Sequence, residues 1–432
     1  MGRLESFVLS SYNKRTMVAF HDVSSTGPIR RFLPFFILGV AILLVGFGVW
    51  FWLHWDEDAK TVEDEIPAEQ PLSEWVTSDP TLEGGIEESD QEFTELPPLP
   101  PPPAPDIERM KYEGCVADGF LSGYGDDINS SVALVKRSKC YSLHRTLETW
   151  ASAPDFKKAR EIQAEVGRAD IVYGMFIAEA LATNEDYYYP AENRKFDFKK
   201  MCRPGSKNDW GEHTCKPSFE RKEYRKYLKY ITERAMDMGI QNFLFGQIFY
   251  QEKADLGEAI IPEIIQEMRD YAAFRGMEIV IGAQTNDITD PVYLGYFDYI
   301  EGGVGLGSDG SVENGPCFSR WWKKPGDWCW ALLWHPDFKD KAKHVMVHFD
   351  WSGKIGDDMS VFTRMTQEER ADTLVRLHQK FKRERVGFLL PLLATLHREN
   401  NGCYGPKKRY YSAHRKYTCQ DEEMVNEILD GK

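Results

Sequence analysis

Residues 241–285 read QNFLFGQIFYQEKADLGEAIIPEIIQEMRDYAAFRGMEIVIGAQT and contain three patterns in succession. Residues 241–251 are mostly apolar and aromatic, which favours a buried strand. Residues 258–276 have the apolar spacing of an amphipathic helix and end in glycine, as helices often do. Residues 277–285 return to the strand pattern. This order predicts two parallel strands joined by a crossover helix.

The same alternation recurs from about residue 111 to residue 432. Helical stretches cover residues 220–239 and 366–387, and Gly239 and Gly387 stand where C-terminal glycines are expected. Together with the two strands above, the chain has seven strand-like runs, the others beginning at Cys115, Asp170, Phe297, His344 and Val386. This pattern predicts an α/β fold, a (β/α)8 TIM-like barrel with one strand unrecognised; a doubly wound open sheet is the alternative.

Two features favour the barrel. Polar residues gather at the C-terminal ends of nearly all these strands, whereas an open sheet concentrates them at one switch point. Glycines also recur within the runs, at Gly119, Gly174, Gly246 and Gly282. Their repetition indicates close backbone approach or a narrow interior.

Residues 32–53, FLPFFILGVAILLVGFGVWFWL, contain no charged side chain. At a rise of about 1.5 Å per residue a helix of this length spans roughly 33 Å, enough to cross a bilayer. The run ends in tryptophan and phenylalanine, which indicates an uncleaved anchor rather than a signal peptide. Basic residues precede it and acidic residues follow it, so residues 1–31 are predicted to be a cytoplasmic tail. The C-terminal domain would then lie at the cell surface, in a periplasm or in a lumen.

Residues 54–110 are acidic and proline-rich, which predicts a disordered stem before a domain at 111–432. Between Asp56 and Arg109 there are 17 acidic and 2 basic residues, a net charge of −15, equal to that of the whole chain. The domain itself is therefore nearly neutral, and no nucleic-acid partner is expected. The run LPPLPPPPAP (96–105) is read as a polyproline spacer, with an SH3 ligand as the less favoured alternative.

All eight cysteines lie beyond the predicted anchor, as suits an oxidising compartment. Sequence alone allows 105 pairings, and the sequential one is predicted. No CxxC motif occurs, so structural zinc is not expected. The predicted disulfides, which would fix long loop insertions, are Cys115 with Cys140, Cys202 with Cys215, Cys317 with Cys329, and Cys403 with Cys419.

In a barrel of this kind the active site lies at the C-terminal ends of the strands. The residues there are rich in carboxylates and amides, and the chain has no nucleophile elbow, P-loop or zinc-protease motif. The polar residues that follow the strands are Asp118, Glu179, Gln247, Gln251, Glu252, Gln284, Asn286, Asp287, Glu301, His348, Asp350 and His397.

Glu301 and Asp350 are the predicted catalytic pair. Glu301 ends a strand directly before two glycines, and Asp350 ends the strand VMVHFD, in which His348 faces the same side. Two carboxyl groups on opposite sides of a bond are what glycoside hydrolysis requires. For each acid the alternative to catalysis is a structural role, either capping the next helix or pairing with a basic residue. Substrate-binding residues are predicted at Glu179, Gln247, Glu252, Gln284, Asp287 and His348, and Glu179, Glu252 and Asp287 are also substitutes in the pair.

Aromatic side chains are abundant in two loops. Residues 317–334, CFSRWWKKPGDWCWALLW, include Trp321 and Trp322, which together with Trp351 are predicted to stack on sugars. The alternative is a small satellite core beneath a long loop. The second loop, residues 186–218, carries Trp210 beside two cysteines and could wall the same cleft.

With acids in YIEGG and HFDWSG and amides in FGQIFYQE and GAQTND, the chain resembles the broad superfamily of TIM-barrel glycoside hydrolases. The resemblance is architectural and covers most of residues 115–396. It implies a glycoside hydrolase with a carboxylate pair. Together with the predicted anchor, this gives a membrane-anchored hydrolase of extracytoplasmic polysaccharide or cell-envelope glycan, for which neither cofactor nor metal is expected. The superfamily usually places its acids after the fourth and seventh strands, whereas the run from Val386 is followed only by His397.

Two other functions stay open. One is a noncatalytic carbohydrate-binding barrel. The other is a type II membrane glycosyltransferase, because tail, anchor, stem and luminal domain follow in that order, although no DxD motif follows a domain strand.

Overall fold

The computed structural model describes residues 97–150, 152–286, 288–307, 310–312, 336–350, 358–396 and 401–431. They belong to the larger of two compact units of the chain, Gln70–Lys432. Within these ranges no helix is long and apolar enough to span a bilayer. Residues 32–53 lie outside them, so the anchor and the orientation inferred from it stay predictions.

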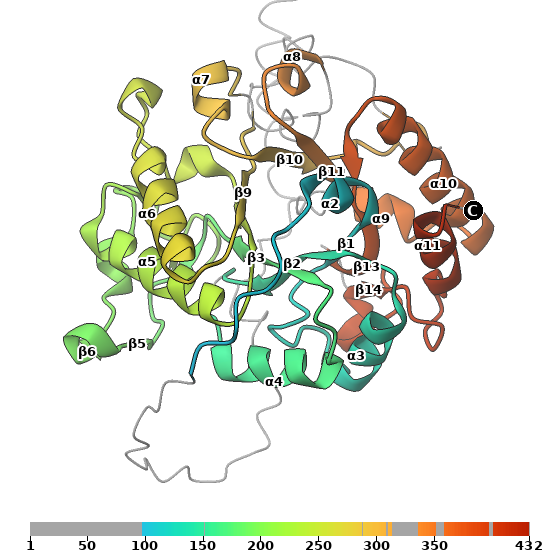
Figure 1. Ribbon diagram of the computed structural model, residues 1–432, viewed down its shortest axis with the longest axis horizontal. Coiled ribbons are helices and arrows are strands. Elements are labelled where there is room, and N and C mark those ends of the chain that lie inside the picture. The colour runs from blue at the N-terminus through green and yellow to red at the C-terminus, as the bar shows by residue number, and fades with distance from the viewer. Residues whose placement is uncertain are drawn as a thin grey trace, which may run out of the picture. The chain divides into compact units, whose positions relative to one another are not determined.

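The centre of this unit is a curled sheet surrounded by helices (Figure 1). β12 pairs with β11 and β13 pairs with β1, both in parallel. Because only Leu389 separates β12 from β13, the two ends of the sheet share one stretch of chain, which is the pattern of a TIM-like barrel. The parallel strands are β1 (Gly114–Ala117), β2 (Ser142–Glu148), β3 (Val172–Ile177), β8 (Asn242–Phe245), β9 (Val280–Ala283), β10 (Tyr299–Gly303), β11 (Val345–His348), β12 (Gly387–Phe388) and β13 (Leu390–Thr395).

The strand that the sequence did not reveal is β2, which pairs with β1 on one side and β3 on the other. Its sequence, SLHRTLE, is mostly polar, although every residue is buried. With β2 counted, the strand from Val386 is the eighth around the barrel rather than the seventh. The seventh strand is β11, which Asp350 follows. His397 follows the eighth strand, so its assignment above to the seventh strand was wrong.

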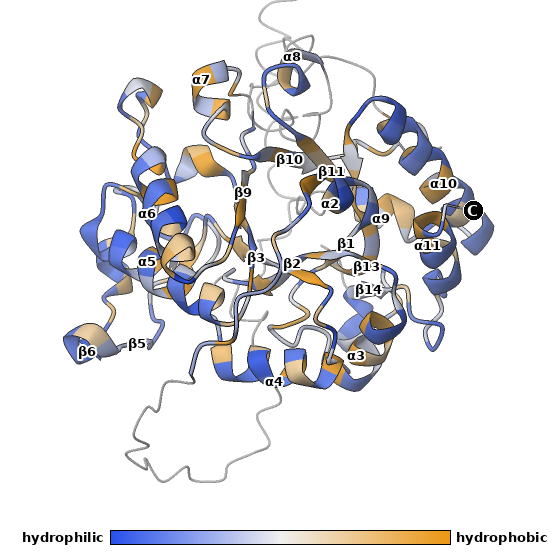
Figure 2. Ribbon diagram, viewed as in Figure 1, coloured by the Kyte–Doolittle hydropathy of each residue, from blue (hydrophilic) through white to orange (hydrophobic). Residues whose placement is uncertain are grey.

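Helices lie outside the ring of strands, and their hydrophilic and hydrophobic positions alternate as in amphipathic helices (Figures 1 and 2). Gly239 and Gly276 end α5 and α6 with positive φ, as predicted. Gly387 does not end α10; it lies in β12, where a Cβ would come within 2.8 Å of Lys111 Cα. The helices are α3 (Ile128–Arg137), α4 (Phe156–Val166), α5 (Lys222–Asp237), α6 (Ile261–Phe274), α7 (Pro291–Leu294), α8 (Pro336–Lys339), α9 (Asp358–Phe362), α10 (Gln367–Arg383) and α11 (Glu422–Leu429).

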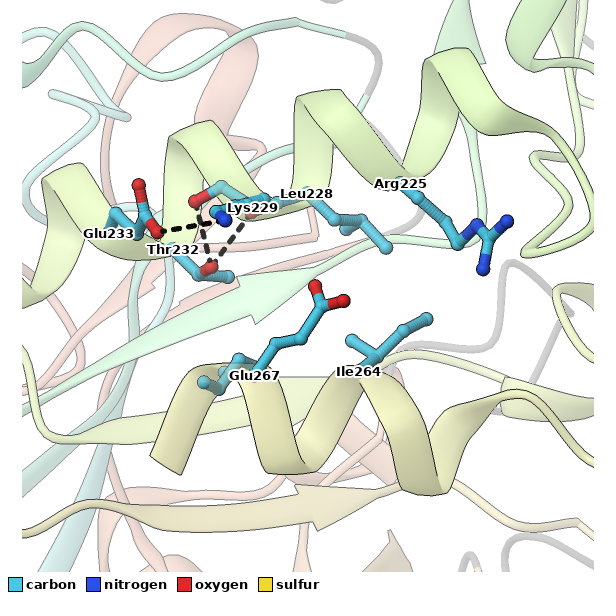
Figure 3. A pocket seen from close by; sticks show the side chains of 8 residues that line it. Arg225, Leu228, Lys229, Thr232, Glu233, Ile264 and Glu267 are labelled. Atoms are coloured by element: carbon cyan, nitrogen blue, oxygen red, sulfur yellow. Dashed lines mark hydrogen bonds and ion pairs between the residues drawn. The ribbon is translucent and has the colours of Figure 1, made fainter. Parts of the chain in front are cut away.

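The main hydrophobic core lies between the strands and these helices. Outside it, α5 and α6 run side by side with a small groove between them, lined by Arg225, Leu228, Thr232, Ile264 and Glu267 among others (Figure 3). Thr232 Oγ1 donates to Leu228 O, which ties its hydroxyl to its own helix. Charged side chains of both helices, among them Lys229 and Glu233, also line it.

A second, smaller cluster fills the barrel interior; it includes Val116, Val172, Phe176, Leu244, Val280, Tyr299, Met346 and Leu389. The interior is narrow, as the glycines predicted. A Cβ on Gly282 would overlap the Tyr299 ring, and one on Gly174 would lie 3.1 Å from two backbone atoms of β2. Gly119 differs, because it lies in a turn with a φ of 59°.

The N-terminal end of the barrel is closed by α2 (Ile107–Glu113). Met110 packs into the interior cluster and is 1% exposed. The proline-rich residues before α2 are bonded to the barrel as well: Leu99 N donates to Asp237 O, and Gln241 Nε2 donates to Pro103 O at 2.7 Å. Residues 97–110, predicted to belong to the disordered stem, are therefore part of the domain.

Three of the predicted disulfides are confirmed: Cys115–Cys140, Cys202–Cys215 and Cys403–Cys419. The fourth, between Cys317 and Cys329, lies outside the described residues. The bridge from Cys202 closes the insertion between β3 and α5, whose short strands are β4 (Leu181–Ala182), β5 (Tyr188–Tyr189), β6 (Arg194–Lys195) and β7 (Thr214–Cys215). The Cys403 bridge follows β13 and flanks β14 (Tyr410–Ser412), which is antiparallel to β13.

Candidate active site

The period-two alternation of the strands brings polar side chains together inside the barrel. Tyr299 and Met346 belong to the interior cluster, so Glu301 and His348, two residues further on, face the same space. His144 of β2 joins them there, because its ring nitrogen contacts Glu301. Sequence reasoning missed His144 together with its strand.

Both carboxylate oxygens of Glu301 are occupied, and the residue is fully buried. His348 Nε2 lies 3.1 Å from Oε1, and Gln284 Nε2 donates to the same oxygen at 3.3 Å. The other oxygen contacts His144 Nε2. The predicted acid is thus the centre of a buried network and does not stand free beside Gly302.

The hydrogen-bond partners fix the protonation of the two histidines. Tyr299 donates to Asn242 Oδ1, so Asn242 Nδ2 donates to His144 Nδ1, and His144 carries its proton on Nε2, as the neutral ring. His348 instead has an acceptor at each nitrogen, because Nδ1 lies 2.9 Å from Phe349 O. Both nitrogens must carry protons, so His348 is cationic.

The pKa values follow from this arrangement. Burial alone raises the pKa of Glu301, but the nearby His144 and His348 outweigh it and hold the pKa well below its usual range. Burial lowers the pKa of His348, and the Glu301 carboxylate outweighs this and raises it to about 9. Glu301 and His348 therefore form a buried ion pair at neutral pH.

A second polar cluster lies at the ends of β1 and β2. Arg145 Nε donates to Glu148 Oε1 at 3.2 Å and lies 3.3 Å from Asp118 Oδ1, while its guanidinium covers the Phe176 ring. Asp118 Oδ2 accepts from Thr395 N, which ties it to β13. Arg145 has a φ of 58°, at the irregularity in the pairing of β2 with β3. Neither Arg145 nor Glu148 was predicted from the sequence, because β2 was not recognised as a strand.

Glu179, a predicted substrate-binding residue, lies beside this cluster at the end of β3. Its Oε1 accepts from Gln247 Nε2 at 2.5 Å, and Gln247 N in turn donates to Gln284 Oε1. A Cβ on Gly246 would overlap Glu179 Oε2, so this glycine, directly after β8, leaves room for the carboxyl group. The predicted group of Glu179, Gln247 and Gln284 is thus brought together.

Glu148 and Glu179 each have one buried oxygen, Oε2, without a hydrogen-bond partner. Leaving such an atom unsatisfied costs about 1–3 kcal/mol. Burial raises the pKa of both groups. The pKa of Glu148 rises to about 8, because burial outweighs the opposing charge of Arg145, which Glu148 shares with Asp118. Bonds from Gln247 and the Glu179 backbone amide favour the charged form of Glu179. Two neighbouring buried carboxyl groups therefore both have raised pKa values.

Asp350 follows β11 and is 6% exposed. Its backbone N–H donates to Asp358 Oδ2, and Asp358 also accepts from the amides of Val304, Gly305 and Leu306. Asp358 therefore shapes the loops after β10 and β11, one of which carries Asp350.

Glu252 is used differently from the prediction. Its Oε1 accepts from Lys253 N and Ile260 N, and its Oε2 accepts from Ile261 N. Both oxygens are occupied at the start of α6, which is the helix-cap alternative. Among the described residues no group of three His, Cys, Asp or Glu is arranged to hold a metal. The predicted site residues outside the described ranges are Asp287, Trp321, Trp322, Trp351 and His397.

The fold and these clusters define a TIM-like barrel with buried carboxyl groups at the C-terminal ends of its strands. No protein-family model matches the chain, and no curated protein sequence matches it.

Several solved glycoside hydrolases match the structure. A family GH27 β-L-arabinopyranosidase from Geobacillus stearothermophilus has 12% identity and a TM-score of 0.36, with 78% of this chain and 77% of that chain covered. Amy13B from Eubacterium rectale has 8% identity and a TM-score of 0.43, covering 78% and 83%. An α-galactosidase from Saccharomyces cerevisiae has 9% identity and a TM-score of 0.35, covering 66% and 59%. The matches single out no family, and at these values they assign neither activity nor residue roles.

Proposed function

We propose that this domain is a glycoside hydrolase in which Glu148 is the general acid and Glu179 the ionised partner. The observation that carries the proposal is the pair of buried, unpartnered oxygens, Glu148 Oε2 and Glu179 Oε2, at the C-terminal ends of adjacent strands. A buried polar atom without a partner calls for an explanation, and a ligand that completes its hydrogen bonds is one. A glycosidic oxygen or a sugar hydroxyl is such a ligand.

The two environments suit two roles. A general acid must hold its proton at neutral pH, and burial raises the pKa of Glu148 to about 8. A nucleophile or base must be ionised. Burial raises the pKa of Glu179, and the hydrogen bond from Gln247 opposes this shift and supports the charged form.

This assignment moves the pair away from Glu301 and Asp350. Glu301 has a histidine contact at each oxygen and a strongly lowered pKa, so it holds no proton to donate. We assign it a positioning role, because Gln284 joins it to Gln247, and Gln247 holds Glu179. Asp350 stays a candidate for contact with substrate from the β11 side.

The substrate we propose is a polysaccharide or envelope glycan outside the cytoplasm, with residues 32–53 as the membrane anchor. The uncharged apolar run and the charge difference across it support this placement. Removing residues 32–53 should release the protein from membranes without loss of hydrolysis.

The test is release of reducing sugar by the full chain from a panel of cell-envelope polysaccharides. Glu148→Gln and Glu179→Gln should each reduce kcat at least a hundredfold while the protein stays folded. Glu252→Gln, which removes a helix cap, is the control expected to lower stability and not kcat. Full activity in Glu148→Gln, with loss in Glu301→Gln or Asp350→Asn, would return the catalytic pair to those residues.

One contact favours a second candidate, a noncatalytic carbohydrate-binding barrel. Arg145 lies 3.2 Å from Glu148, and a carboxylate held by a guanidinium keeps its charge and donates no proton. Sugar binding without turnover in the wild-type protein would support this candidate.

A further inference from the structure

Three half-buried aromatic residues meet beside the carboxyl cluster. The Trp150 and Trp210 ring centroids are 5.4 Å apart, and those of Trp210 and Tyr250 are 5.9 Å apart, both with edge-to-face geometry. Trp150 follows β2 two residues after Glu148, and Tyr250 follows β8 three residues after Gln247. We call these three residues the aromatic wall.

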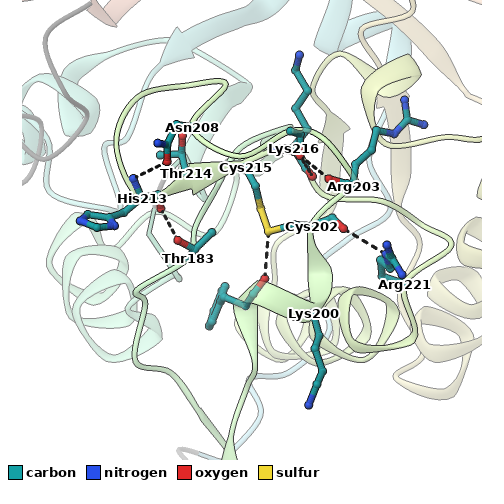
Figure 4. Close-up of a disulfide and its surroundings, with 12 residues drawn as sticks. Thr183, Lys200, Cys202, Arg203, Asn208, His213, Thr214, Cys215, Lys216 and Arg221 are labelled. Atoms are coloured by element: carbon teal, nitrogen blue, oxygen red, sulfur yellow. Dashed lines mark hydrogen bonds between the residues drawn. A yellow bond between two sulfur atoms is a disulfide. The ribbon is translucent and has the colours of Figure 1, made fainter.

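The central member of the wall, Trp210, belongs to the segment between Cys202 and Cys215. Figure 4 shows the disulfide that closes this segment. Trp210 N donates to Thr214 Oγ1, and Lys216 N donates to Ser206 Oγ, so the loop is tied across its base. Besides the bridge, Thr183 N donates to His213 O and Arg203 Nη2 donates to Glu252 O, so the disulfide adds to hydrogen bonds that already join the loop to neighbouring segments.

Lys216 contacts two rings of the wall, and its charge also acts on Glu179. Its ammonium lies 4.0 Å from the Tyr250 ring centroid and 5.4 Å from that of Trp210, and its charge acts on the Glu179 carboxylate. Asp209 lies 3.0 Å from Lys216, so the positive charge is balanced within the loop. The wall therefore has aromatic faces and no net charge.

We propose that the aromatic wall is a subsite for an uncharged pyranose ring next to the scissile bond. Half-buried indole and phenol rings offer apolar faces to the CH face of a sugar. The balanced charge of Lys216 and Asp209 gives no attraction for an acidic sugar. The assignment to the scissile bond rests on the proposed function, whereas sugar binding by the wall does not.

The test measures binding by calorimetry with the full chain carrying Glu148→Gln, so that no turnover interferes. The probes are hexasaccharides of glucose, mannose, galactose and xylose in α and β linkage, with hexagalacturonate as the acidic comparison. Adding Trp210→Ala should raise the Kd of the best neutral hexasaccharide about tenfold or more. The matched control, Phe274→Ala, removes an 81% exposed ring at the C-terminal end of α6 and should leave Kd unchanged.

A second pair of variants tests the loop. Cys202→Ser with Cys215→Ser should weaken binding in the same direction as Trp210→Ala, whereas Cys403→Ser with Cys419→Ser should not. Circular dichroism confirms that each variant is folded.

The outcomes separate the inference from the proposed function. Unchanged affinity in Trp210→Ala, tighter binding of hexagalacturonate, or no sugar binding at all overturns the subsite. Sugar binding that depends on Trp210, in a protein whose wild type hydrolyses nothing, sustains the subsite and removes the hydrolase. Hydrolysis whose KM and kcat are both unchanged by Trp210→Ala sustains the hydrolase and overturns the subsite.

Discussion

At the scale of single residues, Glu301 is a buried charge held by two histidines in different protonation states. His144 donates as a neutral ring, whereas His348 is cationic. Removing one partner of a buried ion pair typically costs 3–5 kcal/mol, because the other charge is left uncompensated. The network therefore makes a specific prediction about stability.

Glu301→Gln should lower the free energy of unfolding by about 3 kcal/mol at pH 6, because His348 loses its counter-charge. Urea unfolding followed by circular dichroism measures the change. Glu113→Gln is the control: it breaks an exposed pair with Arg109 and should cost less than about 1 kcal/mol. Equal effects of the two substitutions would contradict the buried pair.

The same pair predicts a pH dependence. The folded-state pKa of His348 is raised to about 9, so its stabilisation is complete below its unfolded pKa of about 6.5 and is lost as pH rises through 9. The folded-state pKa of Glu301 is lowered, so its stabilisation is complete above about 4.5 and is lost as pH falls. The difference in unfolding free energy between wild type and Glu301→Gln should be largest between about pH 4.5 and 6.5. A difference that grows steadily from pH 6.5 to 9 would show that His348 is neutral.

At the scale of elements, β2 and β8 show how strands position the candidate site. Glu179 lies over Gly246, directly after β8, where a Cβ would take the space of its Oε2 and lie 2.5 Å from Phe176 Cζ. Glu148 and Arg145 both come from β2. The site thus depends on the polar strand β2 and on Gly246, the glycine that directly follows β8.

Gly246→Ala should displace Glu179 and lower kcat at least tenfold, with a stability loss of about 1–3 kcal/mol from overpacking. Gly257→Ala is the matched control, since its nearest neighbour is the Asp255 carboxylate at 3.2 Å. Hydrolysis rates and urea unfolding of the two variants check the prediction. Normal activity in Gly246→Ala would mean that Glu179 has no catalytic role.

Apolar periodicity predicted seven of the eight barrel strands, because their buried residues are hydrophobic. It could not predict β2, since SLHRTLE buries polar residues whose partners include residues far away in the sequence, such as Glu301 for His144. The predicted site therefore contained Glu179, Gln247 and Gln284 but not Glu148 or Arg145. Glu301 was found as a strand-end acid, yet whether it is free or paired depends on residues of other strands.

At the scale of the whole domain, the chain enters the barrel at the end opposite the candidate site. Residues 97–106 are bonded to α5, α6 and the start of β8, and α2 then closes the N-terminal end. The composition of this segment predicted a disordered spacer, but hydrogen bonds to proline carbonyls require no side chain. Only the tertiary structure reveals them.

Met110→Ala should lower the free energy of unfolding by about 2–4 kcal/mol, because it leaves a cavity in the barrel interior. Arg109→Ala, on the exposed side of the same helix, should cost less than about 1 kcal/mol. Urea unfolding distinguishes the two. A negligible effect of Met110→Ala would mean that residues 97–110 belong to the stem and not to the domain.

The most direct test of the central claim, that Glu148 donates a proton to the departing sugar, is the leaving-group dependence of Glu148→Gln. The full-length variant is assayed on an oligosaccharide and on an aryl glycoside of the same sugar with an acidic phenol. The prediction is a loss of about 10²–10⁴-fold on the oligosaccharide and a far smaller loss on the aryl glycoside, which needs no proton. The wild-type rate on the oligosaccharide should also fall above about pH 8. An equal loss on both substrates, or none on either, would contradict the role of Glu148 as the acid.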